Sequence, residues 1–233
     1  MIAIDTVRDD TFFSEHIEDG LSPWLADAQV YRNTSSVSSW TIPAVATIFT
    51  GLYPVQHSAG LFRNQPANLD VDLPSALDES LISLADILTG AQFRTAAFSA
   101  HPWINAKFGL AQGFEQLHPL DGWQAVNSKF YEWLDQRADS PGGQQRFFGY
   151  LHLMEAHDWH LEPLPELETR LAGIEPGLLE LLRADVTRAA CANEGFKACK
   201  SNQVYNLAVR EVRVAIAEVL QNLEERGLLE DTL

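Results

Sequence analysis

Residues 38–54 read SSWTIPAVATIFTGLYP, and the interpretation of the whole chain turns on this stretch. The small and apolar residues from 43 to 49 predict a helix that ends before Gly51. Thr41 precedes this helix, where the N-terminal amides and the helix dipole favour an anion. A hydroxyl there can act as a nucleophile if a metal lowers its pKa. Taken alone, Thr41 is more simply interpreted as a helix cap, and Trp40 as a packing anchor.

Helices alternate with short apolar runs along the rest of the chain. We predict strands at residues 2–4, 29–33, 93–99 and 146–154, and helices at 22–28, 80–88, 126–134 and 204–223. Ser80 is the expected N-cap of its helix, and Gly227 the expected C-cap of the last one. Residues 228–233 are expected to lead into a further strand. This alternation predicts a single α/β domain over residues 1–233, with a mainly parallel sheet flanked by helices.

The composition limits the partners of the protein. The 233 residues carry a formal net charge of −16, which argues against nucleic acid or an anionic membrane surface as the main partner. An anionic small molecule stays compatible, because a bound divalent cation can invert the local field. We find no apolar run of 18 residues and therefore expect no membrane span.

Two further features leave alternatives open. The first ten residues lack the basic region and apolar stretch of a signal peptide, and they do not settle the cellular compartment. Cys191 and Cys199 fit no zinc pattern, and they are either a local disulfide or two free thiols. Both termini look cut, because a strand at residue 2 has no flanking turn and the last helix has no return strand.

Polar residues follow several of the predicted strands. In an open parallel sheet, ligands bind at the carboxyl ends of the strands, and Asp5 stands at such an end. Its alternative role is to cap the following turn. His152, His157 and His160 lie near the end of the strand at 146–154. A separate zinc site built from them is the less favoured alternative, and we interpret His152 as packing within the strand.

Four segments resemble, in order and spacing, the sulfatase family of the alkaline phosphatase superfamily. They are IAIDTVRDD (2–10), SSWTIPAVATIFTGLYP (38–54), GYLHLMEAHDWH (149–160) and YNLAVREVRVAIAEVLQNLEERGLLEDTL (205–233). The resemblance implies an alkaline phosphatase-like fold that is incomplete on its C-terminal side. Residues 1–233 would then be a partial catalytic domain, without the Asp-His-Gly segment that supplies further metal ligands in the family.

The resemblance also implies roles for single residues. Asp5 matches a metal-ligating aspartate, and Thr41 matches the nucleophile that also touches the metal. Thr6 replaces the second aspartate of the family's Asp-Asp pair and would be a weak ligand. His157 matches a histidine that contacts the substrate and can protonate the leaving oxygen. The resemblance aligns His101 with another active-site histidine.

The resemblance implies a divalent metal ion, with calcium first and zinc or manganese as alternatives. Two departures from the family change the expected chemistry. Threonine cannot be converted to the formylglycine of true sulfatases, and Val45 replaces an arginine that steadies the nucleophile. An unmodified threonine is similar to the phosphodiesterase, phosphonate and phosphoethanolamine-transfer branches of the superfamily, and this shifts the expectation from sulfate toward phosphate esters.

The sequence therefore predicts a metal-dependent hydrolase of small-molecule sulfate or phosphate esters. Because the Asp-His-Gly segment would follow Leu233, we expect residues 1–233 alone to bind metal weakly and turn over little. The alternative is a degenerate, non-catalytic relative that binds an anionic ligand or a partner protein, and it is motivated by Val45 and Thr6. The family resemblance is compatible with a periplasmic or extracellular location.

Overall fold

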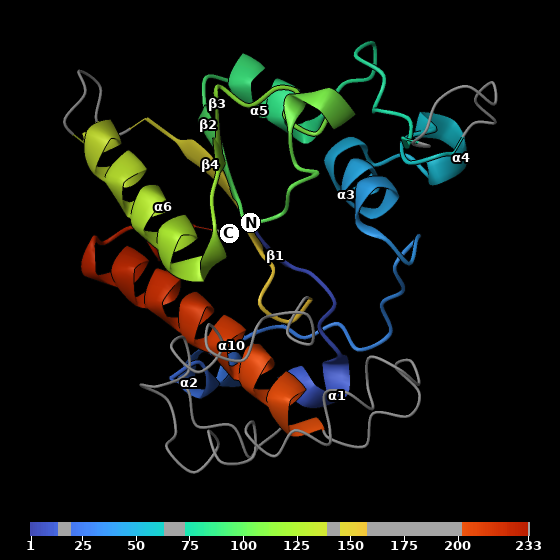
Figure 1. The fold of residues 1–233 in the computed structure, drawn as a ribbon. Coiled ribbons are helices and arrows are strands. Elements are labelled where there is room, and N and C mark those ends of the chain that lie inside the picture. Colours follow the sequence, from blue (N-terminus) through green and yellow to red (C-terminus); the bar gives the residue numbers. More distant parts are fainter. Residues whose placement is uncertain (14–19, 63–72, 139–144, 158–201, 233) are drawn as a thin grey trace.

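The computed structural model describes residues 1–13, 20–62, 73–138, 145–157 and 202–232. Its centre is a parallel sheet with the strand order β1–β4–β2–β3 (Figure 1). The strands are β1 (Ile2–Ile4), β2 (Arg94–Ser99), β3 (Gln116–Pro119) and β4 (Phe147–Leu153). The predicted α/β architecture, with a parallel sheet flanked by helices, is confirmed.

Two long helices cover one face of the sheet. They are α6 (Gly122–Ala138) and α10 (Asn202–Glu225), which lie side by side in Figure 1. Phe98 of β2 and Leu151 of β4 point into this layer and are packed in one buried cluster with Trp133 of α6 and Val212 of α10. Burial of this apolar stripe is what holds α10 in place, because a helix gains most of its stability from tertiary packing.

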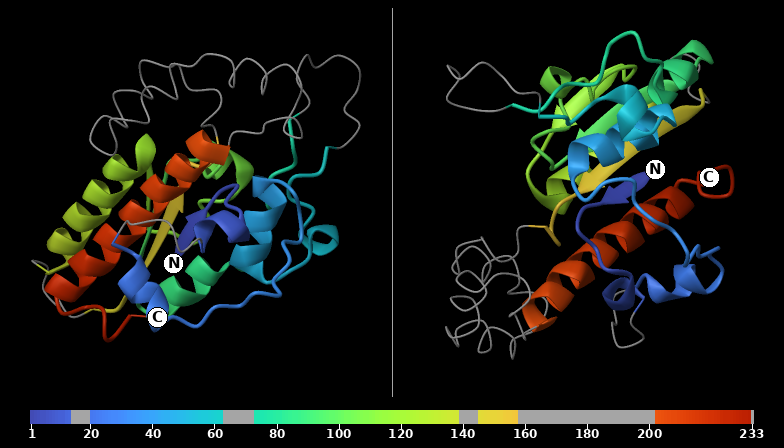
Figure 2. Two further views of the ribbon diagram at one scale, coloured as in Figure 1. Left: turned by 90° about the horizontal axis from the view of Figure 1, so that it is seen from below. Right: turned by 90° about the vertical axis from the view of Figure 1, so that its right-hand side faces the viewer.

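The opposite face carries α3 (Thr41–Thr50), and α5 (Leu84–Gly90) packs against β2. Figure 2 shows α3 across the sheet from α6 and α10. Alternate residues of the strands, Ala97 and Tyr150, meet Ile42 and Phe49 of α3 in a second buried cluster. Side chains of a strand alternate between its two faces, so neighbouring residues of β4 serve different layers.

Shorter elements complete the described chain. They are α1 (Asp9–Phe12), α2 (Ser22–Ala26), α4 (Pro54–His57) and the 3₁₀ turn η1 (Ala106–Phe108). Arg213 of α10 is fully buried and donates hydrogen bonds to the carbonyl of Phe12 and the hydroxyl of Ser22. This guanidinium ties α1 and α2 to α10 and so fixes the segment that follows β1.

The predicted strand at 29–33 is wrong. Those residues form no strand, and the Tyr31 side chain is 74% exposed. Arg32 instead pairs with Asp9 and lies over the ring of Phe13, 4.3 Å from its centroid. A strand needs a neighbour for its backbone hydrogen bonds, and the alternation of residues alone does not supply one.

The helix predicted from Ser80 begins at Leu84. Ser83 is its true cap, because its hydroxyl accepts from the Asp86 amide while the Asp86 carboxylate accepts from the Ser83 amide. The amide and the hydroxyl of Ser80 instead donate hydrogen bonds to Oδ1 of Asp78. The helix predicted at 43–49, by contrast, starts earlier than expected, at Thr41.

Two further segments bear on the predictions, the strand β3 and the residues that follow α10. β3 was not predicted, because its four residues include the polar Gln116 and His118. Residues 228–232 contain a bend and a turn and form no strand themselves, and the further strand expected beyond them stays a prediction. Gly227 does end α10, at φ +63°, and the Leu228 amide returns to the Leu223 carbonyl. Among the described residues, none of the helices is long and apolar enough to span a membrane.

Replacing Phe98 by alanine tests this core. The ring is fully buried between Phe130 and Trp133, so its loss should lower the free energy of unfolding by about 3–5 kcal/mol. Urea unfolding followed by circular dichroism measures this. Ile87→Ala, at a side chain that is 59% exposed, is the control and should change little. Equal effects of the two changes would contradict the assigned core.

Candidate active site at the carboxyl ends of the strands

The parallel pairing brings three chain segments to one edge of the sheet. Ile4 of β1 pairs with Leu153 of β4, and Ser99 of β2 pairs with His152 of β4. The backbone ladder continues one residue further, where the Asp5 amide donates to the Leu153 carbonyl at 3.0 Å. The residues that follow these strand ends therefore meet at one place.

Thr41 reaches this place from the other layer. It is the first residue of α3, and the cap residue before it is Trp40, in an extended conformation. The Thr41 side chain does not cap the helix. Its hydroxyl donates a hydrogen bond of 2.8 Å to Oδ2 of Asp5, and the residue is only 8% exposed. The positive end of the α3 dipole and the amides of its first turn lie beside this hydroxyl.

Asp5 is the centre of the cluster. Its Oδ1 accepts from the Thr6 hydroxyl at 2.8 Å, and its Oδ2 lies 3.4 Å from Nε2 of His152. Nε2 of His101 lies 3.7 Å from the same Oδ2, which is too long for a hydrogen bond but close enough for electrostatic attraction. Burial alone would raise the pKa of Asp5, but the hydrogen bonds from His152, Thr6 and Thr41 outweigh it. They hold the pKa well below its usual value.

His152 is a member of the site that the sequence interpretation missed. It lies in β4 and is 2% exposed, but its ring reaches Asp5 instead of packing only within the strand. The Tyr150 hydroxyl lies 2.7 Å from Nδ1 of His152. Burial, with the charge of Asp5, raises the pKa of Tyr150, so this hydroxyl keeps its proton. The tautomer that satisfies all three groups has Tyr150 donating to Nδ1 and Nε2–H facing Asp5.

The turn after Asp5 is held by a tyrosine from α10. Thr6 has a positive φ of 59°, which is uncommon for a threonine. The Tyr205 hydroxyl donates to the Thr6 carbonyl at 2.8 Å and accepts from the Arg8 amide at 2.8 Å. These two bonds offset the strain at Thr6 and fix the direction of the Asp5 carboxylate.

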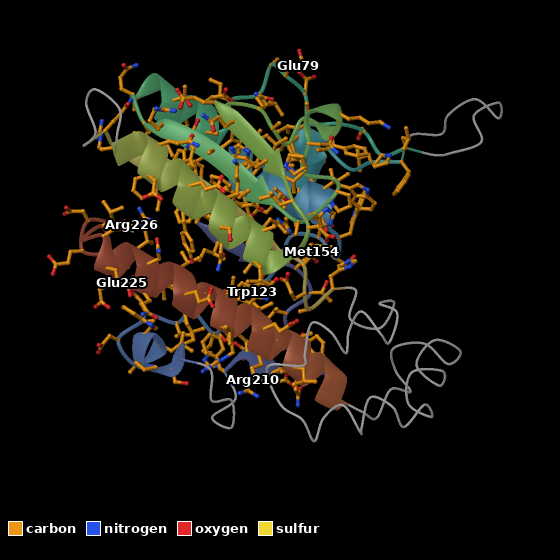
Figure 3. All side chains as sticks on the ribbon, turned by 60° about the vertical axis from the view of Figure 1, so that its left-hand side comes forward. Glu79, Trp123, Met154, Arg210, Glu225 and Arg226 are labelled. Carbon is orange, nitrogen blue, oxygen red and sulfur yellow. The ribbon has the colours of Figure 1, made fainter. Side chains whose placement is uncertain are left out.

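His157 lies in the turn that follows β4. Its ring centroid is 6.2 Å from that of His101, the histidine whose Nε2 faces Asp5. The preceding Glu155 is buried, and its carboxylate accepts from the amides of Trp123 and Met154. Trp123 and Met154 accordingly lie close together at one end of α6 (Figure 3). Glu155 thus joins the start of α6 to the turn that carries His157.

The site offers only part of a metal-binding shell. Asp5 and the Thr41 hydroxyl present adjacent oxygen atoms, and the Thr6 hydroxyl is directed to the far oxygen of the same carboxylate. Within residues 1–13, 20–62, 73–138, 145–157 and 202–232, no group of three or more His, Cys, Asp or Glu is arranged to hold a metal ion. Asp5 and Thr41 alone would supply two oxygen atoms to a divalent cation, fewer than the six to eight ligands that calcium takes. His160 and both cysteines lie outside the described residues.

A cavity of about 350 Å³ lies elsewhere. It is bounded by Gly20, Trp24 and one side of α10, including the carboxylates of Glu218 and Glu224. Burial raises the pKa of Glu218. None of the residues around Asp5 lines this cavity, so it is separate from the cluster at the strand ends.

Comparison with known protein families decides the membership of the chain. The family model described as Sulfatase matches residues 2–233. The chain belongs to the sulfatase family. A search of curated proteins found no match.

Solved structures share the fold of this sulfatase-family chain at low identity. A candidate sulfatase from Bacteroides fragilis, YidJ, superimposes with a TM-score of 0.65 at 15% identity, over 98% of this chain and 58% of that one. The phosphonate monoester hydrolase SpPMH from Silicibacter pomeroyi gives 0.61 at 19%, over 100% and 60%. The lipoteichoic acid synthase LtaP from Listeria monocytogenes gives 0.57 at 16%, over 91% and 47%. The chain thus spans about half the length of these proteins.

Replacing Tyr205 by phenylalanine tests how the Asp5 turn is held. The change removes the acceptor of the Arg8 amide and the donor to the Thr6 carbonyl, at a cost of about 1–3 kcal/mol. Hydrogen exchange at the Arg8 amide should accelerate, as followed by NMR. Tyr31→Phe, at an exposed tyrosine, is the matched control. Unchanged protection of Arg8 in Tyr205→Phe would contradict the assignment.

The lowered pKa of Asp5 predicts a pH dependence of stability. Because the pKa is lower in the folded than in the unfolded state, ionised Asp5 stabilises the fold at neutral pH, and this contribution is lost as the pH falls below about 4. The free energy of unfolding should therefore decrease more steeply in the wild type than in Asp5→Asn between about pH 5 and pH 2. Urea unfolding at a series of pH values measures the difference, and parallel curves would contradict it.

Proposed function

We propose that this site belongs to a metal-dependent hydrolase of sulfate or phosphate esters, with Thr41 as the nucleophile. The observation that carries the proposal is the 2.8 Å hydrogen bond between Thr41 Oγ1 and Asp5 Oδ2, at the N-terminus of α3. A hydroxyl, a fixed carboxylate and a helix N-terminus at one sheet edge suit the attack on an anionic ester.

In the proposed reaction, the anionic group of the ester lies at the start of α3. The Thr41 hydroxyl loses its proton to a water molecule and its oxygen attacks the phosphorus or sulfur atom. The bond to the leaving oxygen breaks as that oxygen takes a proton from His157. Water then cleaves the ester formed on Thr41 and restores the hydroxyl. The low pKa of Asp5 makes its carboxylate a weak base, so Asp5 orients Thr41 through the hydrogen bond and does not itself remove the proton.

A divalent cation would be held by Asp5 and Thr41 with further ligands. When bound, it supplies the positive charge that lowers the pKa of the hydroxyl and balances the charge of the substrate. By family resemblance the ion is calcium. The two imidazoles beside Asp5 keep zinc and manganese as alternatives, because histidine is a ligand for such metals and calcium prefers oxygen.

His157 is the proposed proton donor to the leaving group. His157 is assigned to protonate the leaving oxygen, and His101, whose Nε2 lies 3.7 Å from Asp5 and whose ring neighbours that of His157, is assigned to contact the transferred group. His152 and Tyr150 keep Asp5 in place and are positioning residues.

Phosphate esters are favoured over sulfate esters. Threonine cannot give the formylglycine of true sulfatases, and a similar solved structure is that of a phosphonate monoester hydrolase. The fold itself is compatible with both, since another similar structure is that of a candidate sulfatase.

One observation favours a second candidate, a non-catalytic protein that binds anions. Val45, at the position of the family's arginine, is 3% exposed and packs in the core beside Ile42. In the described part of the chain, no lysine or arginine pairs with Asp5 or hydrogen-bonds to Thr41, so no side-chain cation there stabilises the charge that develops during attack on an ester. Such a protein would bind phosphate at α3 without turnover.

Thr41→Ala separates the two candidates. Loss of the nucleophile should lower the rate of aryl phosphate hydrolysis at least about a thousandfold, with the fold retained. Thr41→Ser, which keeps a hydroxyl, should retain much of the rate. Rates are measured with 4-nitrophenyl phosphate and 4-nitrophenyl sulfate in the longest expressed form of the protein, with calcium, manganese or zinc.

Circular dichroism of both variants provides the folding control. Full activity of Thr41→Ala would overturn the role of Thr41. Phosphate binding without turnover in the wild type, with every metal tried, would favour the non-catalytic candidate.

A further inference from the structure

An aromatic cluster adjoins the strand-end site. Trp40 stacks on Phe62 with ring centroids 5.4 Å apart and planes 15° apart. Trp103 meets Trp40 edge to face, at 5.6 Å and 90°. Phe62 is 60% exposed and Trp103 is 37% exposed. Two large rings thus remain in contact with solvent, although they belong to one contiguous group, and such exposed apolar groups often mark ligand sites.

The cluster is connected to the candidate site through two chain segments. Trp103 lies beside His101, with ring centroids 5.5 Å apart, and its amide donates to Nδ1 of that histidine at 3.0 Å. The other ring nitrogen of His101 faces Asp5. From the second side, Trp40 directly precedes Thr41 and is the cap residue of α3. Both the proposed nucleophile and a proposed substrate-contacting histidine therefore have a tryptophan of this cluster as a near neighbour.

The back of the cluster is built to hold Trp40 firmly. Gly60 has φ +80°, and a Cβ at this position would lie 2.9 Å from Cζ2 of Trp40 and 2.6 Å from Cδ of Pro43. A larger residue at 60 would therefore displace the tryptophan ring or the first turn of α3. This agrees with the interpretation of Trp40 as a packing anchor, and it leaves Phe62 and Trp103 as the accessible rings.

We propose that Trp40, Phe62 and Trp103 form a subsite for a planar aromatic ring in the organic group of the ester. The inference rests on the proposed function, in which the anionic group lies at Thr41. An ester of this kind has a charged end and an apolar end. The start of α3 at Thr41 would take the charged end, and the aromatic cluster would take the apolar end. The plane of Trp103 is perpendicular to that of Trp40, and Phe62 lies nearly parallel to Trp40. A flat ring can therefore stack on one plane and present its edge to the other.

Two phosphonates test the subsite without turnover, because neither has an ester bond. Phenylphosphonate carries the ring, and methylphosphonate carries the same anionic group without it. Isothermal titration calorimetry in the presence of calcium should show tighter binding of phenylphosphonate. Phe62→Ala and Trp103→Ala should each lower the affinity for phenylphosphonate about three- to tenfold. Both variants should leave the affinity for methylphosphonate unchanged, within about twofold.

The controls separate ring binding from a general loss of structure. Tyr53→Ala removes another exposed aromatic ring, 65% exposed and outside this cluster, and should change neither affinity. Phe62→Tyr keeps a ring and should retain the preference for phenylphosphonate. Trp40 is left unchanged because it also packs closely on Gly60 and against the buried cluster that contains Ile42.

Each remaining outcome counts against a stated part of the proposal. Equal affinity for both phosphonates, unaffected by Phe62→Ala and Trp103→Ala, would overturn the ring subsite and leave the anion site standing. Binding of neither phosphonate would overturn the subsite together with the proposed function. Phosphocholine is the third ligand. If it binds more tightly than phenylphosphonate and loses affinity in the same variants, the ligand group on the aromatic faces would be a cation and not a planar ring.

Discussion

The parallel pairing of β1, β4 and β2 is the constraint on which the rest of the structure depends. Parallel strands end at the same edge of a sheet, so residues that are far apart in sequence are brought together when their strands align. Here the register of β4 with both neighbours puts Asp5 and His101 on either side of His152. The helices on both faces hold this register, because slippage would turn buried side chains toward the wrong layer.

The Asp5 carboxylate is a partly buried charge that hydrogen bonds stabilise. An isolated ionised carboxylate is unfavourable in such a setting, and three hydrogen bonds offset this in the folded protein. The donors come from β4, from α3 and from the turn after β1, so the same bonds that stabilise the charge also join three parts of the fold. Tyr205 extends this support to α10. Stability and the geometry of the site therefore depend on the same contacts.

More of the fold than of the candidate site could be predicted from the sequence. Apolar runs alternating with helical patterns predicted β1, β2, β4 and α10, because local periodicity is enough for elements that bury one face. The same reasoning failed at 29–33, where Arg32 binds Asp9 and no neighbouring strand is present. It also missed β3, which is short and partly polar and is a strand because it pairs with β2. Pairing of strands depends on tertiary contacts that a local pattern does not contain.

For the site, the sequence alone determined the chemical groups: a carboxylate at a strand end, a hydroxyl before a helix, and histidines after strands. It determined the family as well, through four motifs in order. Only the tertiary structure decided which groups touch. The family resemblance implies that Thr41 and Asp5 lie near each other, and the structure adds the direct hydrogen bond between them. It also brings His101 near the same oxygen and turns His152 toward it, with the Tyr150 hydroxyl on the other ring nitrogen. The physical reason is that strand order and register place a side chain in space, and neither property is encoded in the residues adjacent to it.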